Sequence, residues 1–150
     1  MKIEDEINQK EFISQKQKAT INLIFTSSWL MNKHKEFFKV YGLTPQQFNV
    51  LRILRGQHPG SISTAEIKAR MLDKNSDASR IVDRLTLKAF ATKLVCPKDR
   101  RLVDVSISKD GLNLLKRMDK KITELDNELG INETEAAQLN ILLDKVRNGK

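Results

Sequence analysis

A change in the hydrophobic period near residue 90 constrains the fold of this chain more than any other feature of the sequence. Before it, apolar residues recur at steps of three and four, which is typical of amphipathic helices. Residues 91–108 instead alternate between apolar and polar side chains around a turn at Pro97–Arg100, which is typical of a β-hairpin. We therefore expect a mostly α-helical protein with one small hairpin.

The alternation also predicts which hairpin side chains face the protein. Val103, Val105 and Ile107 are expected on the inner face of the return strand, and Leu94 and Cys96 on the same face of the first strand. Four polar residues are expected on the opposite face: Lys93, Asp104, Ser106 and Ser108. Because Cys96 then lies at an apolar-facing position, we interpret it as a small core residue and not as a redox sensor.

Two capping boxes indicate helix starts ahead of the hairpin. Thr44–Gln47 (TPQQ) and Ser63–Glu66 (STAE) each place a hydroxyl three residues before Gln or Glu. The helix after Ser63 is expected to end near Leu72, and after residues 73–75 another begins at Ser76. The apolar face of this last helix is expected to contain Ala78, Ile81, Val82, Leu85 and Ala89. Two helices around a short turn are typical of a helix-turn-helix, and with the hairpin they predict a winged helix.

Long helices are expected at both ends of the chain. One spans residues 10–41, where apolar pairs recur every seven residues: Leu23/Ile24, Leu30/Met31 and Phe37/Phe38. Another carries Leu115, Met118, Ile122, Leu125 and Leu129, and a last helix follows a cap at Asn132–Glu135. Spare apolar surface on both terminal segments favours a dimer interface. We expect dimerisation helices at 1–42 and 109–150, with a winged helix-turn-helix lobe at 43–108 between them.

Positive charge is concentrated in the middle third of the chain. The net charge is +8, and residues 52–101 alone carry 12 Lys and Arg against five Asp and Glu. Residues 1–51 contribute a net charge of +2 and residues 102–150 a net charge of −1. Charge gathered in one segment indicates a face that binds a polyanion, with double-stranded DNA as the expected partner.

The motif inventory argues against an enzyme, a metalloprotein or a membrane protein. The two histidines, His34 and His58, lie 24 positions apart, and the sequence has no Cys-x-x-Cys, no nucleophile elbow and no Gly-rich phosphate loop. We expect no cofactor and no metal. The apolar runs are short and the chain has a single cysteine, so we expect a cytoplasmic protein with no membrane partner.

Three stretches resemble the MarR family of winged-helix transcriptional regulators: LTPQQFNVLRIL, LDKNSDASRIVDRL and, above all, CPKDRRLVDVSISKDG. The resemblance covers roughly residues 20–145. It implies an obligate homodimer with intertwined terminal helices, a recognition helix in the major groove, wings in the minor groove, and often a small aromatic or anionic effector. The chain departs from the family at Ala89–Phe90, where Gly and an aliphatic residue are usual, and at Asp77, where an uncharged residue is usual.

The candidate DNA contacts lie on the recognition helix and the wing. Ser76, Asp77, Ser79 and Arg80 occupy the first turns, from which a recognition helix reaches base edges, and Arg84 and Lys88 are expected at phosphates. On the wing, the candidates are Lys98, Arg100 and Arg101. Asp99 is expected to orient a neighbouring arginine, and the spacing favours Arg101 over Arg100 as the residue that enters the minor groove.

A candidate effector pocket is bordered by six residues: Trp29, His34, Phe37, Phe38, Tyr41 and Arg52. Core packing is an alternative role for each of them. The function that these observations predict is a homodimeric, sequence-specific regulator, expected to be a repressor that binds a pseudo-palindromic operator. The alternative is a winged-helix module for protein–protein contacts that recognises no operator.

Overall fold

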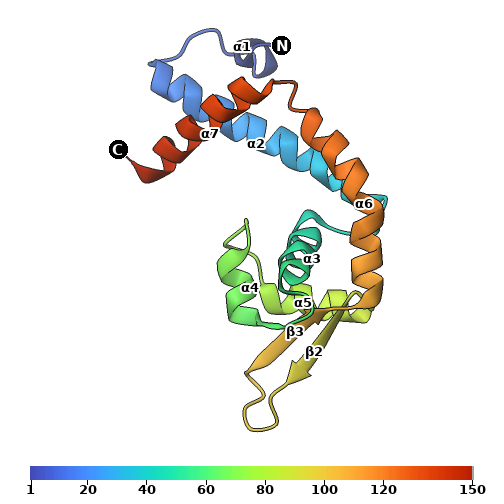
Figure 1. The fold of residues 1–150 in the computed structure, drawn as a ribbon. Helices are drawn as coiled ribbons and strands as arrows, with labels where there is room; N and C mark the ends of the chain where they lie inside the picture. Colours follow the sequence, from blue (N-terminus) through green and yellow to red (C-terminus); the bar gives the residue numbers. More distant parts are fainter. Residues whose placement is uncertain (150) are drawn as a thin grey trace. The chain divides into compact units, whose positions relative to one another are not determined.

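The computed structural model describes residues 1–149 and divides into two compact units, Met1–Leu112 and the residues from Asn113 on. The chain is mostly helical, with one three-stranded antiparallel sheet, as the sequence predicted. Figure 1 shows the sheet as a hairpin that projects beyond the helices of the first unit. No helix within residues 1–149 is both long enough and apolar enough to cross a membrane.

The N-terminal segment forms two helices instead of one. Helix α2 (Gln15–Lys39) begins five residues later than expected, because Ser14 is its N-cap: the Ser14 side chain accepts a hydrogen bond from the Gln17 backbone N–H at 3.1 Å. A short helix α1 (Ile3–Glu6) precedes it, with Ile3 buried. Glu4 forms an ion pair with Lys18, and this hydrogen bond lowers the pKa of the Glu4 carboxyl.

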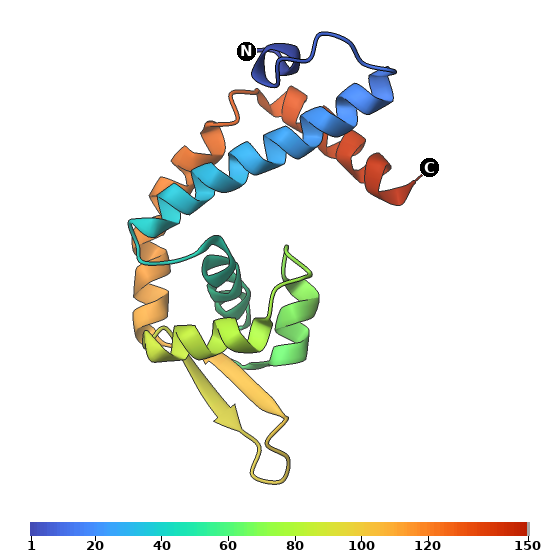
Figure 2. The ribbon, with the colours of Figure 1, turned by 180° about the vertical axis from the view of Figure 1, so that it is seen from behind.

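The core of the lobe is built from α3 (Pro45–Gln57), α4 (Thr64–Arg70) and α5 (Ala78–Leu87). Both predicted capping boxes are present: Thr44 with Gln47 starts α3, and Ser63 with Glu66 starts α4. The buried side chains at the centre of this core are Val50, Leu51, Leu54, Ile67, Val82 and Leu85. Figure 2 shows α5 beside α4 and across the base of the hairpin. One face of α5 is buried by these neighbours, and the other face is exposed to solvent.

Helix α5 is shorter at both ends than the sequence predicted. It begins at Ala78 and not at Ser76, because the Asp77 carboxylate caps it by accepting from the Arg80 backbone N–H. It ends at Leu87, and Ala89 has a φ of +61° in a left-handed turn. The expectation that Ala89 lies on the buried helical face is therefore wrong, and Ala89 is exposed.

The sheet contains β1 (Ile62–Ser63), β2 (Ala91–Val95) and β3 (Val103–Ile107), in the order β1-β3-β2. On β3, Val105 and Ile107 are buried as expected. On β2 the predicted faces are reversed, because Lys93 lies opposite Val105 and Leu94 lies opposite Asp104. Residues directly opposite each other share a face of a sheet.

The reversal on β2 comes from the turn. The connection spans residues 96–102 and not 97–100, and a register change of one residue moves every side chain to the other face. Leu94 is consequently 73% exposed. Cys96 lies beyond the end of β2 and is half-buried, so it is not a core residue.

Helix α6 (Lys109–Asn127) follows β3 directly, and its start lies against Ala89 and Phe90, which follow α5. Ser108 accepts from the Gly111 backbone N–H at 3.0 Å and donates to the Ala89 carbonyl at 2.6 Å. A side chain at Gly111 would clash with the Phe90 carbonyl oxygen and lie 2.8 Å from Cγ1 of Ile107. The polar-Gly start of this helix is therefore a packing requirement of the hairpin.

The second unit contains the rest of α6 and helix α7 (Glu133–Asn148). On α6 the buried side chains are Leu114, Leu115, Met118 and Leu125, and Leu129 lies beyond the helix and is exposed. The predicted cap is present, because Asn132 and Glu135 form a capping box at the start of α7. None of the described residues of α7 is buried, and four large apolar side chains on it are exposed: Leu139, Ile141, Leu142 and Val146.

Candidate nucleic-acid interface

Helix α5 is held by its apolar face and presents a polar, basic face to solvent. Ala78, Val82 and Leu85 are buried, whereas four residues between them are exposed: Ser79, Arg80, Asp83 and Arg84. The buried face lies against α3 and α4. The structure therefore groups Ser79, Arg80 and Arg84, which the sequence singled out, on one accessible helix surface.

Asp77 and Ser76 precede the helix and do not belong to its first turn. The Asp77 carboxylate oxygen Oδ1 lies 3.1 Å from the Arg80 backbone nitrogen, and Ser76 is half-buried. A carboxylate at this position also interacts favourably with the positive end of the helix dipole. Asp77 therefore serves as the N-cap of α5.

An ion pair that the sequence did not indicate fixes α5 against the hairpin. Lys93 Nζ on β2 lies 2.6 Å from Asp83 Oδ1 on α5. The predicted strand faces placed Lys93 with the outward-facing polar residues, so this contact was missed. The correct register would have placed Lys93 on the same face as Val105 and indicated a partner on α5.

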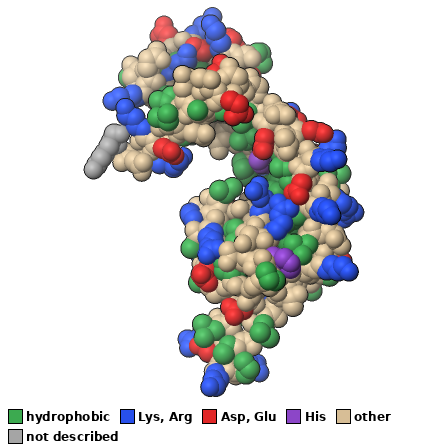
Figure 3. All heavy atoms as spheres, viewed as in Figure 1, with side chains coloured by type: hydrophobic (Ala, Val, Ile, Leu, Met, Phe, Trp, Pro, Cys, Tyr) green, Lys and Arg blue, Asp and Glu red, His purple; other side chains and the backbone are tan. Residues whose placement is uncertain are grey.

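The end of the hairpin carries exposed cations beside one acid. Lys98, Arg100 and Arg101 are all exposed, and the Arg101 side chain retains 92% of its accessible surface. Asp99 Oδ1 accepts hydrogen bonds from the Arg101 backbone N–H at 3.0 Å and from its Nε at 3.2 Å. The structure thus brings Asp99 together with Arg101 and leaves Arg100 outside that pair. Lys and Arg side chains are visible at this end of the molecule in Figure 3.

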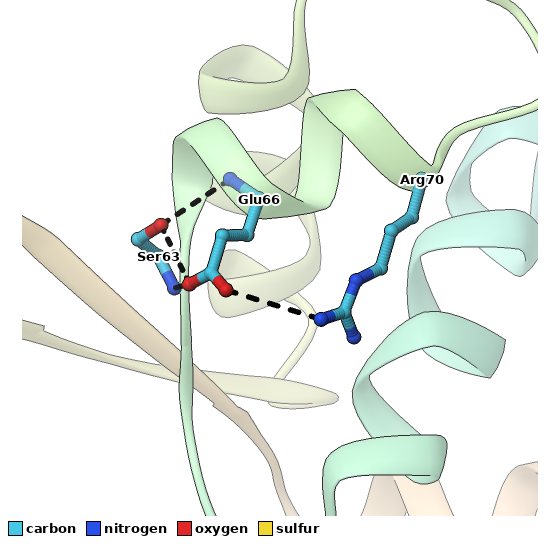
Figure 4. A network of polar contacts seen from close by, with 3 residues as sticks. All are labelled: Ser63, Glu66 and Arg70. Atoms are coloured by element: carbon cyan, nitrogen blue, oxygen red, sulfur yellow. Dashed lines mark hydrogen bonds and ion pairs between the residues drawn. The ribbon is translucent and has the colours of Figure 1, made fainter.

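The start of α4, which precedes α5, carries a small polar network (Figure 4). The Ser63 hydroxyl donates to Glu66 Oε2 at 3.0 Å and accepts from the Glu66 backbone N–H at 3.2 Å. Arg70 Nη2 lies 3.9 Å from the other carboxylate oxygen of Glu66. The sequence predicted the cap but not the arginine, which lies four residues further along the same helix face.

Lys88 is an exposed residue, but its ammonium has hydrogen-bond partners on the lobe itself. Its Nζ donates to the Gly42 carbonyl oxygen and, at 3.2 Å, to Oε1 of Gln47. Both acceptors lie at the start of α3 or just before it. No pattern in the sequence indicated this contact, since Lys88 and Gly42 are 46 residues apart.

Five of the six candidate effector-pocket residues lie close together. Phe38 is buried and stacks on Phe48 with ring centroids 4.3 Å apart, and His34 and Phe37 each meet Phe38 edge-on. Tyr41 lies 5.5 Å from Phe37, and the Arg52 guanidinium lies 6.0 Å from the Phe48 ring. The cluster therefore joins the end of α2 to α3 through aromatic contacts.

The sixth residue, Trp29, lies elsewhere on α2. It lines a shallow hollow of about 280 Å³ together with Ile3 and Phe25, and Lys33 lies over its ring. Among residues 1–149, no three His, Cys, Asp or Glu side chains are grouped so that they could hold a metal ion.

Comparisons with known proteins agree with this geometry. A model of the MarR family matches residues 41–102, from the end of α2 into the wing. The chain is 37% identical over 76 residues to the transcriptional repressor MdtR of Bacillus subtilis, a match that covers 51% of this chain and about half, 48%, of MdtR.

Solved structures match over almost the whole chain. A MarR transcription factor from Planctomyces limnophilus is 30% identical, with a TM-score of 0.70 over 91% of this chain and 98% of that protein. A mutant MarR from E. coli, solved with operator DNA, is 23% identical and has the same fold, with a TM-score of 0.75 over 91% of this chain and 99% of that one. These relatives are transcription factors and not enzymes. The chain belongs to the MarR family of DNA-binding transcriptional regulators and has its winged-helix fold.

Proposed function

We propose that this protein is a homodimeric, sequence-specific repressor that acts in the cytoplasm and releases its operator when a small molecule binds. The observation that carries the proposal is the pairing of two basic, exposed elements on one lobe: the outer face of α5 and the end of the hairpin. The operator complex of the E. coli relative and the description of MdtR as a repressor support the same function.

Helix α5 reads the sequence of the operator in this proposal. Ser79 and Arg80 lie in its first turn, where side chains of a recognition helix reach base edges in the major groove. Arg84 lies one turn further on and contacts a phosphate. Ser76 and Asp77 stay candidates at the N-terminal end, where the Asp77 carboxylate also caps the helix.

The wing adds affinity in the minor groove. A narrow minor groove concentrates negative potential and favours an inserted guanidinium. The Arg101 side chain is exposed at its tip and restrained at its base by Asp99, so it is the residue we assign to the groove. Lys98 and Arg100 flank it and contact phosphates.

Dimerisation is proposed from exposed apolar side chains on the terminal helices. On α2 the exposed set is Leu23, Ile24, Trp29 and Met31, and Ile24 keeps 63% of its accessible surface. On α7, Ile141 and Val146 are 67% and 66% exposed. Large exposed apolar side chains on one helix suit a surface that another chain covers. Residues 1–42 and 109–150 are therefore proposed as the dimerisation segments, and residues 43–108 as the DNA-binding lobe.

The effector is proposed to be an aromatic or anionic molecule that binds beside His34, Phe37, Tyr41 and Arg52. The aromatic rings supply faces for stacking and the exposed Arg52 guanidinium supplies a partner for an anionic group. Because this cluster joins α2 to α3, a ligand there would alter the element on which α5 is packed.

A second candidate function, a protein-interaction module, is favoured by one observation. Leu94 and Leu102, both on the hairpin, are 73% and 60% exposed. An apolar wing flank suits contact with another protein better than contact with a phosphate backbone.

Selection of bound duplexes from random DNA tests the proposed function directly. A dimeric regulator should enrich a two-fold symmetric sequence whose half-sites lie about one helical turn apart. An interaction module should enrich no sequence, and its weak DNA binding should be independent of base order.

A further inference from the structure

Lys88 is the exposed C-cap residue of the recognition helix, and its ammonium lies against the residues that join α2 to α3. It donates to the Gly42 carbonyl oxygen and to Oε1 of Gln47, and so uses two of its three N–H donors on protein acceptors. Lys88 is also the residue after the last turn of α5, directly before the left-handed Ala89. The end of α5 is therefore attached to the segment that joins α2 and α3.

Gln47 makes this attachment specific. It is a buried polar residue, 5% exposed, and its Oε1 also accepts from the Thr44 backbone N–H at 3.2 Å. One oxygen thus serves both the α3 cap and Lys88, with one lone pair for each. Without Lys88 this buried oxygen would keep the Thr44 N–H as a donor but leave its second lone pair without a partner, so the contact with Lys88 is favoured.

Gly42 completes the contact at the end of α2. It has a φ of +68°, and the Gly42 and Leu43 backbone N–H groups bond back to the Lys39 and Phe38 carbonyls, which ends the helix in a Schellman-type turn. Phe38 in turn stacks on Phe48 in α3. The acceptors for Lys88 therefore lie in a hydrogen-bonded turn and in the first turn of α3.

We infer that Lys88 is a positioning residue, which sets the orientation of the recognition helix through Gln47 and Gly42 and does not bind a DNA phosphate. The inference rests on the proposed function, since it concerns how α5 meets the operator. Apolar packing on α3 and α4 buries one face of α5. The polar contacts at Lys88 and at the Asp83–Lys93 ion pair define its position along that surface.

The experiment compares full-length variants on the operator duplex obtained by selection from random DNA, over a range of salt concentrations. Lys88→Met removes the ammonium, Gln47→Met removes its buried acceptor, and a double variant combines them. Gln47→Glu keeps the acceptor oxygen and is the conservative control. Arg84→Ala, on the exposed face of α5, is the reference for the removal of a phosphate contact. Thermal unfolding and sizing establish that each variant is folded.

Positioning predicts that Lys88→Met and Gln47→Met each weaken binding, roughly two- to thirtyfold. The slope of log K against log salt should equal that of the wild type in both. The double variant should bind no more weakly than the weaker single variant, and Gln47→Glu should bind nearly as the wild type. Arg84→Ala should instead flatten the slope by about 0.9 for each phosphate that it no longer neutralises.

Two results together overturn the inference. In one, Lys88→Met flattens the slope of log K against log salt as Arg84→Ala does; in the other, Gln47→Met binds the operator with wild-type affinity. The salt dependence of Lys88→Met decides the matter even if Gln47→Met does not fold. If the wild type enriches no sequence, the proposed function fails instead. In that case the NMR chemical shifts of the backbone amides of residues 78–87 are compared with those of the wild type. Shifts that change in the same way in Lys88→Met and Gln47→Met support the positioning role. Unchanged shifts in Gln47→Met refute it.

Discussion

Asp99 holds Arg101 by two hydrogen bonds, one from the backbone N–H at 3.0 Å and one from Nε at 3.2 Å, while the rest of the Arg101 side chain is exposed. The pair restrains the base of the side chain and leaves the terminal nitrogens free to donate elsewhere. A restrained arginine loses less rotamer entropy when it binds. An acidic residue beside DNA can thus increase affinity through geometry although its charge opposes binding.

Replacing Asp99 with Ala should therefore weaken operator binding, although it removes a negative charge from the wing. The expected loss is about 0.5–1 kcal/mol for each wing, in the range of an exposed ion pair. Asp104→Ala is the matched control, since Asp104 is an exposed acid on the same hairpin. It should bind at least as tightly as the wild type. Competition binding at a fixed salt concentration measures the operator affinity of both variants. An Asp99→Ala variant that binds the operator more tightly than the wild type would show that simple charge repulsion dominates.

Arg80→Ala should relax sequence discrimination more than it lowers affinity. Arg80 lies exposed in the first turn of α5, and a good bidentate base contact is worth about 1–3 kcal/mol of discrimination. Binding to the selected operator and to single-base variants of it gives the discrimination at each position. Discrimination should fall at one base pair of each half-site while non-specific affinity changes little. Unchanged discrimination at every position would remove Arg80 from the set of base contacts.

Ala89→Gly should stabilise the protein, whereas Ala69→Gly should destabilise it. Ala89 has a φ of +61°, a conformation that costs a residue with a side chain about 1–2 kcal/mol and glycine almost nothing. Ala69 lies within α4, where glycine costs about 1 kcal/mol. Chemical denaturation of both variants gives the free energies of unfolding. Destabilisation of similar size in both would mean that the left-handed turn after α5 does not exist.

A charged residue at Ile24 should disrupt the proposed dimer. Ile24→Glu places a carboxylate in the exposed apolar row of α2, and burying it against another chain would leave an unpaired charge. Lys35→Glu, on an exposed position of the same helix, is the control that introduces the same side chain. Sizing with light scattering should give a monomer or a concentration-dependent mixture for Ile24→Glu and a dimer for the control. A wild type that is itself monomeric would refute the dimer.

Deleting residues 1–40 should give aggregated or unfolded protein for a related reason. The deletion removes Phe38, which is 2% exposed and stacks on Phe48, together with the apolar row of α2. Loss of a buried phenylalanine alone costs about 3–5 kcal/mol. Circular dichroism and sizing of the truncated chain measure the outcome. A soluble, cooperatively folded monomer would contradict the proposed role of residues 1–42.

Local signals in the sequence predicted three helix starts correctly. The caps at Thr44, Ser63 and Asn132 were found because a capping box satisfies backbone groups within four residues. The buried face of α5 was found for Ala78, Val82 and Leu85 because helical periodicity is also local. Asp77 was misjudged, since a cap and a first-turn residue differ by one position.

Features that depend on non-local geometry could not be predicted in the same way. The faces of β2 depend on the length of the turn, and the seven-residue connection reversed the expected side of Leu94. The contacts of Lys93 with Asp83 and of Lys88 with Gln47 require the packing of α5 on its neighbours. The six candidate effector-pocket residues were grouped from the sequence alone, but Trp29 lies apart from the other five.

The salt dependence of operator binding by an Arg100→Ala, Arg101→Ala double variant tests the central claim most directly. If the wing enters the DNA, the variant should bind its operator more weakly by several kcal/mol per dimer, since each good contact is worth about 1–3 kcal/mol. The slope of log K against log salt should flatten by about 0.9 for each phosphate that the variant no longer neutralises, provided that it still folds. A double variant with wild-type affinity and an unchanged slope would contradict the account, because the wing cations would then be solvated in the complex.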